Sequence, residues 1–194
     1  MGWYQKLNQY FPEEEMKKKQ QLEDLVRRNT NYKKAETEQY ILLYGEYEEF
    51  VFVDYVLVDK KARGLGIGSH IFEELKEKEK VIVLEVEPVV ENDPDTARRE
   101  QFYLGNGFKK AEDIIYYRDV GETSEELNQM EVYYWSPQGS ESMEDIRNYM
   151  IIVYEDIHHF QYDDYFDRQT PDPEELVQIE QSDDSQGMEQ QPRA

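Results

Sequence analysis

Three glycines at alternate positions form the stretch of this sequence best suited to binding an anion. They lie between Arg63 and Ser69, in R-G-L-G-I-G-S, after an apolar alternating run and before an amphipathic segment. A strand, a glycine loop and a helix start place several backbone N–H groups around a phosphate. Lys60 and Lys61 add positive charge beside the loop in an otherwise acidic chain. The stretch therefore predicts a phosphate-binding turn, and the alternative is a glycine-rich connection without a ligand.

Acidic side chains within predicted strands are the candidates for a group that accepts a proton. Glu85 and Glu87 share one face of the run 81–87, because successive strand residues alternate between faces. Asp54 interrupts the apolar run 47–58. Burial raises the pKa of a carboxyl group and makes it a better base for proton transfer. Glu85 and Asp54 are the leading candidates, and a solvated strand end or a buried ion pair is the alternative for each.

The overall composition narrows the classes of partner. With 44 Asp and Glu against 22 Lys and Arg, the net charge is −22, which argues against nucleic-acid or anionic-membrane binding. The acidity would suit a cationic amine, and the alternative, which we favour, is that it only keeps the protein in solution. No cysteine is present, so disulfides, zinc–thiolate sites and cysteine nucleophiles are excluded. His70, His158 and His159 do not form a ligand set, so no metal is predicted. No apolar run approaches the ~20 residues that span a bilayer, and we expect a cytoplasmic protein.

Hydrophobic periodicity predicts the elements that would position these residues. A strand at 47–58, a helix at 67–79 and a strand at 81–87 form a βαβ unit, whose two strands are normally parallel. The unit therefore places the glycine loop at the end of the first strand and Glu85 near the end of the second.

The region before the βαβ unit is predicted to contain helices and a hairpin. Pro12 suits the first turn of a helix at 12–28, with glutamates near its N-terminus and arginines at its C-terminus. Residues 40–44 then alternate, and Gly45 predicts the tight turn of a β-hairpin. We therefore expect residues 1–38 to form N-terminal helices of the domain.

The C-terminal region is predicted to add one helix, within 138–166, and a tail to a core at 39–137. Residues 167–194 are rich in Asp, Glu, Gln, Pro and Ser, which predicts a disordered acidic tail. We expect the apolar stripe of the helix to pack in the core, and the alternative is a homodimer through residues 146–160. The whole chain is predicted to be of the α/β (α+β) class, with a mixed sheet flanked by helices. The stripe consists of Ile146, Met150, Val153, Ile157 and Phe160.

Two short motifs flank the second strand of the βαβ unit. The first is R-x-x-G-x-G, which begins at Arg63 and opens a helix. The second is F-Y-L-G-N-G-F, from Phe102 to Phe108, at the end of a helix predicted to begin at Asp93-Pro94, where Asp93 is a candidate N-cap. The dinucleotide pattern G-x-G-x-x-G needs a third glycine that this register lacks, and no Gly-Lys-Ser/Thr of a P-loop follows. Together the motifs resemble the GNAT superfamily of N-acetyltransferases, over Gln39 to Trp135.

The resemblance implies acetyl-CoA as co-substrate and a primary amine, on a small molecule or a protein, as acceptor. It implies that loop N–H groups hold the pyrophosphate, that the backbone of Leu57 and Val58 meets the pantetheine and acetyl carbonyl, and that Tyr103 protonates the departing thiolate. A phenol, with an ordinary pKa near ~10, keeps its proton at neutral pH. Packing is the alternative for this motif, since Gly107 suits a left-handed helix end with Phe108 folded back. The cofactor-binding residues implied are Leu57, Val58, Arg63, Gly64, Leu65, Gly66, Ile67, Gly68 and Ser69.

The function predicted is therefore an acetyl-CoA-dependent N-acetyltransferase. Transfer would be direct, in a ternary complex, with Glu85 or Asp54 accepting the proton of the amine and Tyr103 supplying that of the thiolate. The alternative is a catalytically silent acyl-CoA-binding or protein-interaction module. Release of free CoA thiol in the presence of amines separates the two.

Overall fold

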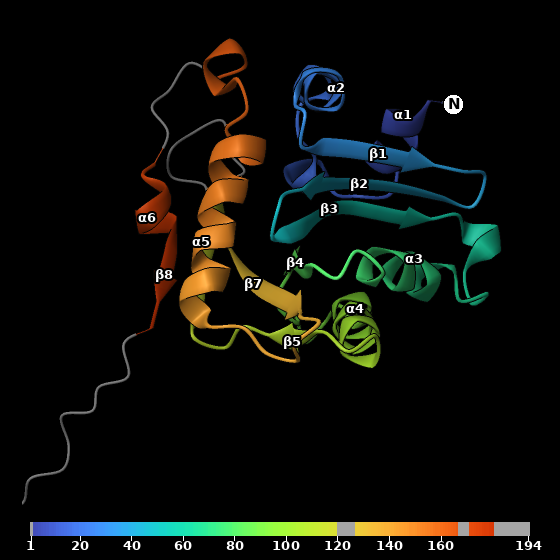
Figure 1. Ribbon diagram of the computed structural model, residues 1–194. Coiled ribbons are helices and arrows are strands. Elements are labelled where there is room, and N and C mark those ends of the chain that lie inside the picture. Colours follow the sequence, from blue (N-terminus) through green and yellow to red (C-terminus); the bar gives the residue numbers. More distant parts are fainter. Residues whose placement is uncertain (1, 120–126, 167–170, 181–194) are drawn as a thin grey trace, which may run out of the picture.

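The computed structural model describes residues 2–119, 127–166 and 171–180. Its strands are β1 (Tyr32–Glu36), β2 (Tyr40–Glu46), β3 (Phe50–Val58), β4 (Val81–Val86), β5 (Lys109–Lys110), β6 (Ile114–Asp119), β7 (Leu127–Trp135) and β8 (Val177–Ile179). Within the described ranges they form one sheet in the order β1-β2-β3-β4-β7-β6-β8, with β5 paired to β7 (Figure 1). All of these pairs are antiparallel except β3 with β4. The predicted mixed sheet flanked by helices is confirmed.

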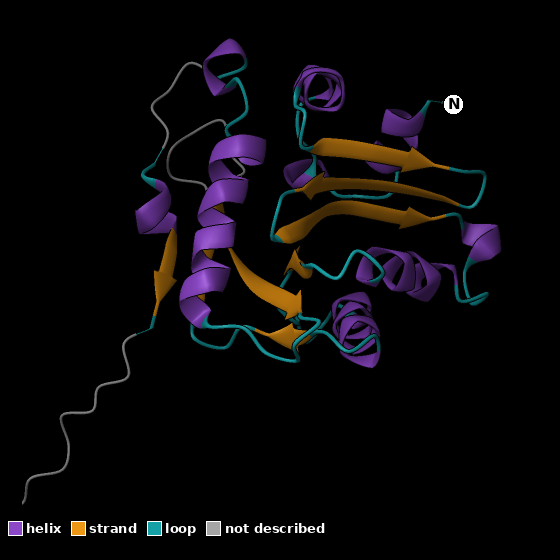
Figure 2. Ribbon diagram, viewed as in Figure 1, coloured by secondary structure: helices purple, strands orange, loops and turns teal. Residues whose placement is uncertain are grey.

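Helical segments cover both faces of this sheet (Figure 2). They are α1 (Trp3–Asn8), α2 (Lys19–Arg28), α3 (Ile67–Lys76), α4 (Pro94–Gly105), α5 (Met143–Val153) and α6 (Pro173–Leu176), with the 3-10 turns η1 (Glu13–Glu15), η2 (Lys60–Ala62) and η4 (Tyr162–Asp164) and the π turn η3 (Tyr154–His158). Phe72 and Leu75 of α3 and the partly buried Tyr103 of α4 belong to the apolar cluster on one face. Leu22 of α2 and Ile146 of α5 belong to the cluster on the other face.

The two parallel central strands stay paired for only part of their length. Phe50–Val53 of β3 pairs with Val81–Leu84 of β4. Beyond these residues β3 stays paired with β2 as far as Val58, whereas β4 stays paired with β7 as far as Val86. The C-terminal halves of β3 and β4 therefore diverge. The predicted βαβ unit is confirmed, with α3 as its crossover helix.

The helix predicted at 12–28 is wrong in its first half. The chain forms the 3-10 turn η1, continues in extended backbone and only then enters α2. The Tyr55 hydroxyl and the Arg118 guanidinium donate to the carbonyl oxygen of Glu15, at 2.7 and 3.1 Å. These tertiary hydrogen bonds engage a carbonyl that a continuous helix would use internally. The chain therefore turns inward here and carries Glu15 and Lys17 toward the sheet.

The prediction that residues 1–38 form only helices is also wrong, because they include β1. This edge strand pairs antiparallel with β2 and completes a three-stranded meander with β3. Its sequence, Y-K-K-A-E, lacks apolar alternation because only Tyr32 is buried. Lysines are common on edge strands, where they discourage pairing with another chain. Period-two patterning therefore gave no signal for this strand.

The role predicted for Gly45 is wrong as well. The residue lies inside β2, opposite Phe52, and the turn of the hairpin falls between β2 and β3. A Cβ atom at position 45 would lie 2.8 Å from Cδ1 of Ile157, which is buried. The glycine therefore allows the C-terminal helical segment to pack directly against the sheet.

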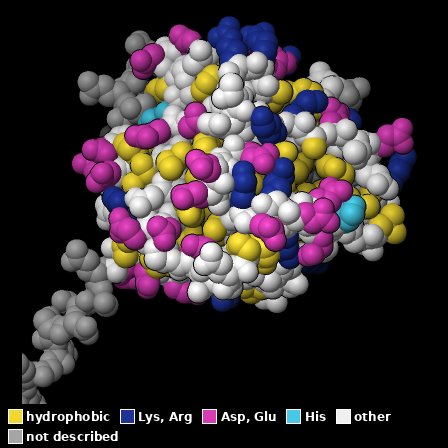
Figure 3. Space-filling model, viewed as in Figure 1, with side chains coloured by type: hydrophobic (Ala, Val, Ile, Leu, Met, Phe, Trp, Pro, Cys, Tyr) yellow, Lys and Arg dark blue, Asp and Glu magenta, His cyan; other side chains and the backbone are white. Residues whose placement is uncertain are grey.

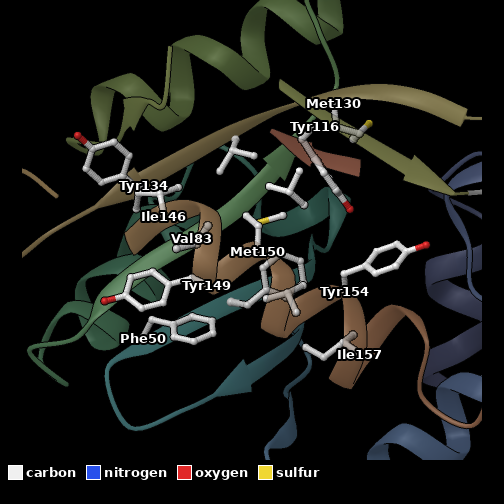
Figure 4. Packing of buried hydrophobic residues seen from close by; sticks show 14 of the residues in the cluster. Phe50, Val83, Tyr116, Met130, Tyr134, Ile146, Tyr149, Met150, Tyr154 and Ile157 are labelled. Atoms are coloured by element: carbon white, nitrogen blue, oxygen red, sulfur yellow. The ribbon is translucent and has the colours of Figure 1, made fainter. Parts of the chain in front are cut away.

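The apolar stripe of the predicted C-terminal helix packs in the core, as expected (Figure 4). Ile146, Met150, Val153 and Ile157 are fully buried. Tyr149 stacks on Phe50 of β3, with ring centroids 4.4 Å apart. The chain's own core occupies this stripe, so it does not provide the dimer surface considered from the sequence.

The disordered tail predicted at 167–194 is wrong for residues 171–180. These residues form α6 and β8, and β8 pairs antiparallel with β6. Leu176 and Val177 are buried, so two adjacent apolar side chains anchor a segment that looks acidic by composition. Residues 167–170 and 181–194 lie outside the described residues.

Acidic side chains spread over much of the visible surface, in keeping with the net charge of −22 (Figure 3). Lys and Arg side chains lie among them rather than forming one continuous basic face in this view. In the described part of the chain, no helix combines the length and the apolar character needed to cross a membrane.

Candidate active site

The opening between β3 and β4 forms a cleft of about 180 Å³. Residues of α3 and α4 line it from one face of the sheet, and residues near α1 and η1 line it from the other. Such a cleft can receive two reactants from opposite sides of the sheet. Among its lining residues are Tyr10, Glu15, Asp54, Val58, Gly68, Glu85, Glu87, Arg99, Tyr103 and Arg118.

The glycine loop ends in a helix N-terminus whose N–H groups are available. Gly64 and Gly66 have φ of +79° and +78°, a conformation that favours glycine. Gly66 is the N-cap of α3, and no side chain caps this end. His70 donates the first N–H bond to Gly66, so the N–H groups of residues 67–69 have no acceptor within the helix. This geometry suits a phosphate group.

The structure gathers the nine predicted cofactor-binding residues around the end of β3 and the start of α3. Leu57 and Val58 lie on the part of β3 that no longer pairs with β4. The Arg63 side chain turns back toward this strand. Its Nε donates to the Val58 carbonyl oxygen at 3.3 Å, and its guanidinium carbon lies 4.9 Å from the ring centroid of Tyr10. In this conformation a phosphate would meet the backbone of Arg63 rather than its charge.

Tyr103 lines the cleft from α4. Its ring makes edge-on contacts with Phe72 and Phe108, with centroids 5.9 and 6.1 Å away. Burial raises the pKa of its hydroxyl to about 12, so the phenol keeps its proton. Gly107 has φ of +81°, and Phe108 N–H donates to the Tyr103 carbonyl oxygen at 3.1 Å. The helix end weighed as the alternative is present, and it holds Tyr103 in place.

Glu85 is held in a buried network of charges and hydroxyl groups. Its Oε1 lies 2.7 Å from His158 Nε2 and accepts from Tyr116 at 2.8 Å, and its Oε2 lies 3.5 Å from Arg118. Burial alone would raise the pKa of Glu85, but His158 and Arg118 outweigh it and hold the pKa at about 2. Such a carboxylate is a weak base at neutral pH. This geometry does not favour the proton-accepting role predicted for Glu85.

Asp54, on the neighbouring strand β3, is also held by a cationic side chain and a tyrosine hydroxyl. Lys17 Nζ contacts its two carboxylate oxygens at 2.7 and 2.8 Å, and the Tyr32 hydroxyl donates to it at 2.5 Å. The side chains of Lys17 and Asp54 are only 5% and 1% exposed. The alternative weighed from the sequence, a buried ion pair, is what the structure shows for both predicted bases.

Glu15 is a cleft carboxylate that the sequence analysis missed. It lies at the end of η1, and its Oε1 atom is buried without a hydrogen-bond donor in the described part of the chain. Glu87, which accepts from Arg99, lines the same cleft. Burial raises the pKa of Glu15, and the Glu87 carboxyl raises it further, to about 7. A base of this strength suits proton transfer near neutral pH.

The other missed residues are Lys17, Arg118 and His158. Arg118 carried a usable signal, because it alternates with Ile114 and Tyr116 on the buried face of β6. A charge on the apolar face of a strand indicates a buried partner. Lys17 and His158 carried none, since each reaches its partner through an irregular segment, before α2 and in the π turn η3.

A second groove, of about 530 Å³, adjoins the cleft and shares Tyr10, Val58 and Arg63 with it. It lies against Ile41 and Leu57, which belong to the cluster under α1 and α2. Lys6, Lys60 and Lys61 also line this groove. It therefore extends the cleft on the face opposite α3 and α4.

Parallel central strands that diverge beside a glycine loop and an uncapped helix define the class of this protein as an acetyltransferase-type α+β fold. The proposed acetyltransferase YjbC of Bacillus subtilis (strain 168) is 43% identical over 180 residues, which cover 92% of this chain and 93% of that protein. A GNAT-family structure from Bacteroides thetaiotaomicron superposes with a TM-score of 0.65 at 24% identity, over 80% of this chain and 87% of the other. No protein-family model matches the chain. The chain belongs to the same acetyltransferase family as the Bacillus subtilis relative, and it has the fold of the GNAT-family structure.

Proposed function

We propose that this protein transfers the acetyl group of acetyl-CoA to a primary amine. The observation that carries the proposal is the cleft between β3 and β4. It has a protonated phenol on the α4 side, carboxylates on the η1 side, and the uncapped start of α3 beside it. These are the parts that a thioester donor and an amine acceptor need when they enter from opposite faces.

The residues around the loop fit the phosphate-bearing end of acetyl-CoA. The N–H groups of residues 67–69 point out of the helix start, and Gly66 leaves room because nothing lies within 4 Å of a Cβ placed there. The unpaired edge of β3 at Leu57 and Val58 offers hydrogen-bonding groups to an extended amide chain. Bound acetyl-CoA supplies the thioester that reacts.

The residues that line the cleft have separate roles in the transfer. The open edge of β3 orients the donor, which holds the reacting carbon at a fixed place in the cleft. Tyr103 donates a hydrogen bond to the sulfur that leaves, because burial keeps its hydroxyl protonated. The acidic η1 side attracts a cationic amine and takes up its proton.

The direct test follows free thiol release from acetyl-CoA with a panel of amines, including small diamines, amino acids and peptides. Release that depends on both substrates and yields the N-acetyl product, identified by mass spectrometry, supports the proposal. Saturable acetyl-CoA binding with no amine-dependent release would instead indicate the silent acyl-CoA-binding module.

Replacement of Gly66 by alanine should weaken acetyl-CoA binding by about tenfold or more. The left-handed conformation costs a residue with a Cβ roughly 1–2 kcal/mol, so the loop shifts and moves the N–H groups of α3. Isothermal titration calorimetry of acetyl-CoA measures the effect.

Gly139→Ala is the matched control, because Gly139 also has a positive φ, of +88°, and open space around it. It lies in the turn after β7 and does not line the cleft. We expect a similar loss of stability with unchanged acetyl-CoA affinity. Equal affinity in Gly66→Ala would contradict the assigned role of the loop.

A further inference from the structure

Among the acidic residues that line the cleft, Glu15 differs in having a buried carboxylate oxygen, Oε1, that receives no hydrogen bond from any described residue. Asp54 and Glu85, by contrast, are each bound by a cation and a tyrosine hydroxyl. A buried carboxylate oxygen without a donor costs free energy, which a proton or a cationic ligand would recover.

The backbone of Glu15 is fixed, which gives its side chain a defined direction. Tyr55 and Arg118 both donate to its carbonyl oxygen, and Tyr55 also accepts from the Lys17 N–H at 3.1 Å. Tyr55 is buried in the core and Arg118 is 9% exposed. The turn that breaks the predicted helix is therefore held by the sheet itself and presents Glu15 to the cleft.

The charged and titratable side chains around Glu15 come from the described elements that border the η1 side of the cleft. Glu87 follows β4, and Arg99 pairs with it from α4. After burial, the Glu87 carboxyl is the next cause that raises the pKa of Glu15, because a second carboxyl group disfavours its ionised form. The charged and titratable residues that line the cleft with Glu15 are Tyr10, Asp54, Tyr55, Arg63, Glu85, Glu87, Arg99, Tyr103 and Arg118.

We infer that Glu15, whose carboxyl group lines the cleft, is the catalytic base that takes the proton of the acceptor's ammonium group. The inference rests on the acetyl transfer proposed above and names the cationic amine as the form that enters. The groups described so far put this base on the η1 side and the proton donor Tyr103 on the α4 side.

The proton balance of the transfer is complete with these groups. Glu15 receives one proton from the ammonium group, and the free amine forms the C–N bond as the C–S bond breaks. Tyr103 passes its proton to the leaving sulfur, and the acetylated nitrogen loses its second proton, which restores Tyr103. The proton on Glu15 then leaves to solvent, so the products are the amide, the thiol and one proton.

The test is the pH dependence of kcat/KM for the amine in Glu15→Gln, with Glu13→Gln as the matched control. Glu13 lies on the same 3-10 turn and is exposed. In the wild type we expect kcat/KM to fall about tenfold per pH unit below an apparent pKa of about 7, because the base is then protonated. Glu15→Gln should lose this limb and about 10²-fold in rate at pH 8.

Three further readouts separate catalysis from structure. Acetyl-CoA affinity should be unchanged in Glu15→Gln, Glu15→Asp should recover part of the rate, and a carboxyl carbon that titrates near pH 7 by NMR should vanish in Glu15→Gln. A Glu15→Gln enzyme with the wild-type rate and profile overturns the inference while the proposed transfer stands. A wild-type protein that releases no thiol with any amine removes the proposed transfer, and the inference with it.

Discussion

Tyr103→Phe should lower kcat by about 10²–10³-fold and leave acetyl-CoA affinity nearly unchanged. The substitution removes a single hydroxyl that faces the cleft and keeps the ring contacts with Phe72 and Phe108. Removal of one positioned donor to a developing negative charge typically has an effect of this size. The loop at the start of α3, which we propose holds the donor, is not altered.

The raised pKa of Tyr103 shapes this prediction. A phenol with a pKa of about 12 is a weaker acid than an ordinary thiol, so complete proton transfer must be coupled to the proton lost by the acetylated nitrogen. The hydroxyl therefore acts first as a hydrogen-bond donor to the forming thiolate. We expect single-turnover rates, which isolate the chemical step, to fall as steeply as kcat.

Tyr134→Phe is the matched control for Tyr103→Phe. Tyr134 is 5% exposed and lies on β7 within the other apolar cluster (Figure 4). It should retain the wild-type rate. If Tyr103→Phe turns over as fast as this control, Tyr103 has a packing role only.

Lys17→Met should lower the free energy of unfolding by about 3–5 kcal/mol. The variant keeps the volume of the side chain but leaves the Asp54 carboxylate, 1% exposed, with the Tyr32 hydroxyl and no cation. Removal of one partner from a buried ion pair typically costs this much, because the remaining charge stays out of water. Urea denaturation followed by far-UV circular dichroism gives the value.

Two control variants show whether the loss of stability in Lys17→Met comes from breaking the buried ion pair. Lys19→Met breaks the exposed pair with Glu23, whose side chains are 59% and 50% exposed, and should cost no more than about 1 kcal/mol. The double variant Lys17→Met/Asp54→Leu removes both buried charges and should recover most of the loss, since an apolar replacement of a whole pair is often neutral. A Lys17→Met variant as stable as Lys19→Met would show that the pair adds nothing.

The parts of the fold that could be predicted are those encoded in short stretches of sequence. Asp93 before Pro94 predicts a helix start, and its side chain does accept from the Asp95 N–H. Alternation along β4 places Val83 and Glu85 on one face of the strand. The structure agrees, because Val83 belongs to one apolar cluster and the residues on either side of it in β4 belong to the other. β1 could not be predicted, because an edge strand with a polar sequence has no local pattern that distinguishes it.

The residues of the candidate site also divide into those that the sequence predicts and those that it does not. The glycine loop and Tyr103 could be predicted because each is carried by a contiguous motif. Glu15, Lys17 and His158 could not, because they come from separate segments that only the folded sheet brings together. The alternation of Arg118 along β6 indicated a buried partner but not which residue that partner is. The sequence indicated that Glu85 and Asp54 lie in apolar strands. It could not distinguish a carboxylate that accepts a proton from one in a buried ion pair, because both give the same pattern of one acidic residue in an apolar run.

The contact between His158 and Glu85 also sets an order of events during synthesis. Glu85 and Arg118 leave the ribosome before the π turn that carries His158 and before β8, which covers the edge of β6. Until those later segments arrive, a carboxylate at the centre of the sheet lacks one of its partners and β6 keeps an open edge. The contacts of Glu85 and the pairing of β6 are therefore completed only after these C-terminal segments have been synthesised.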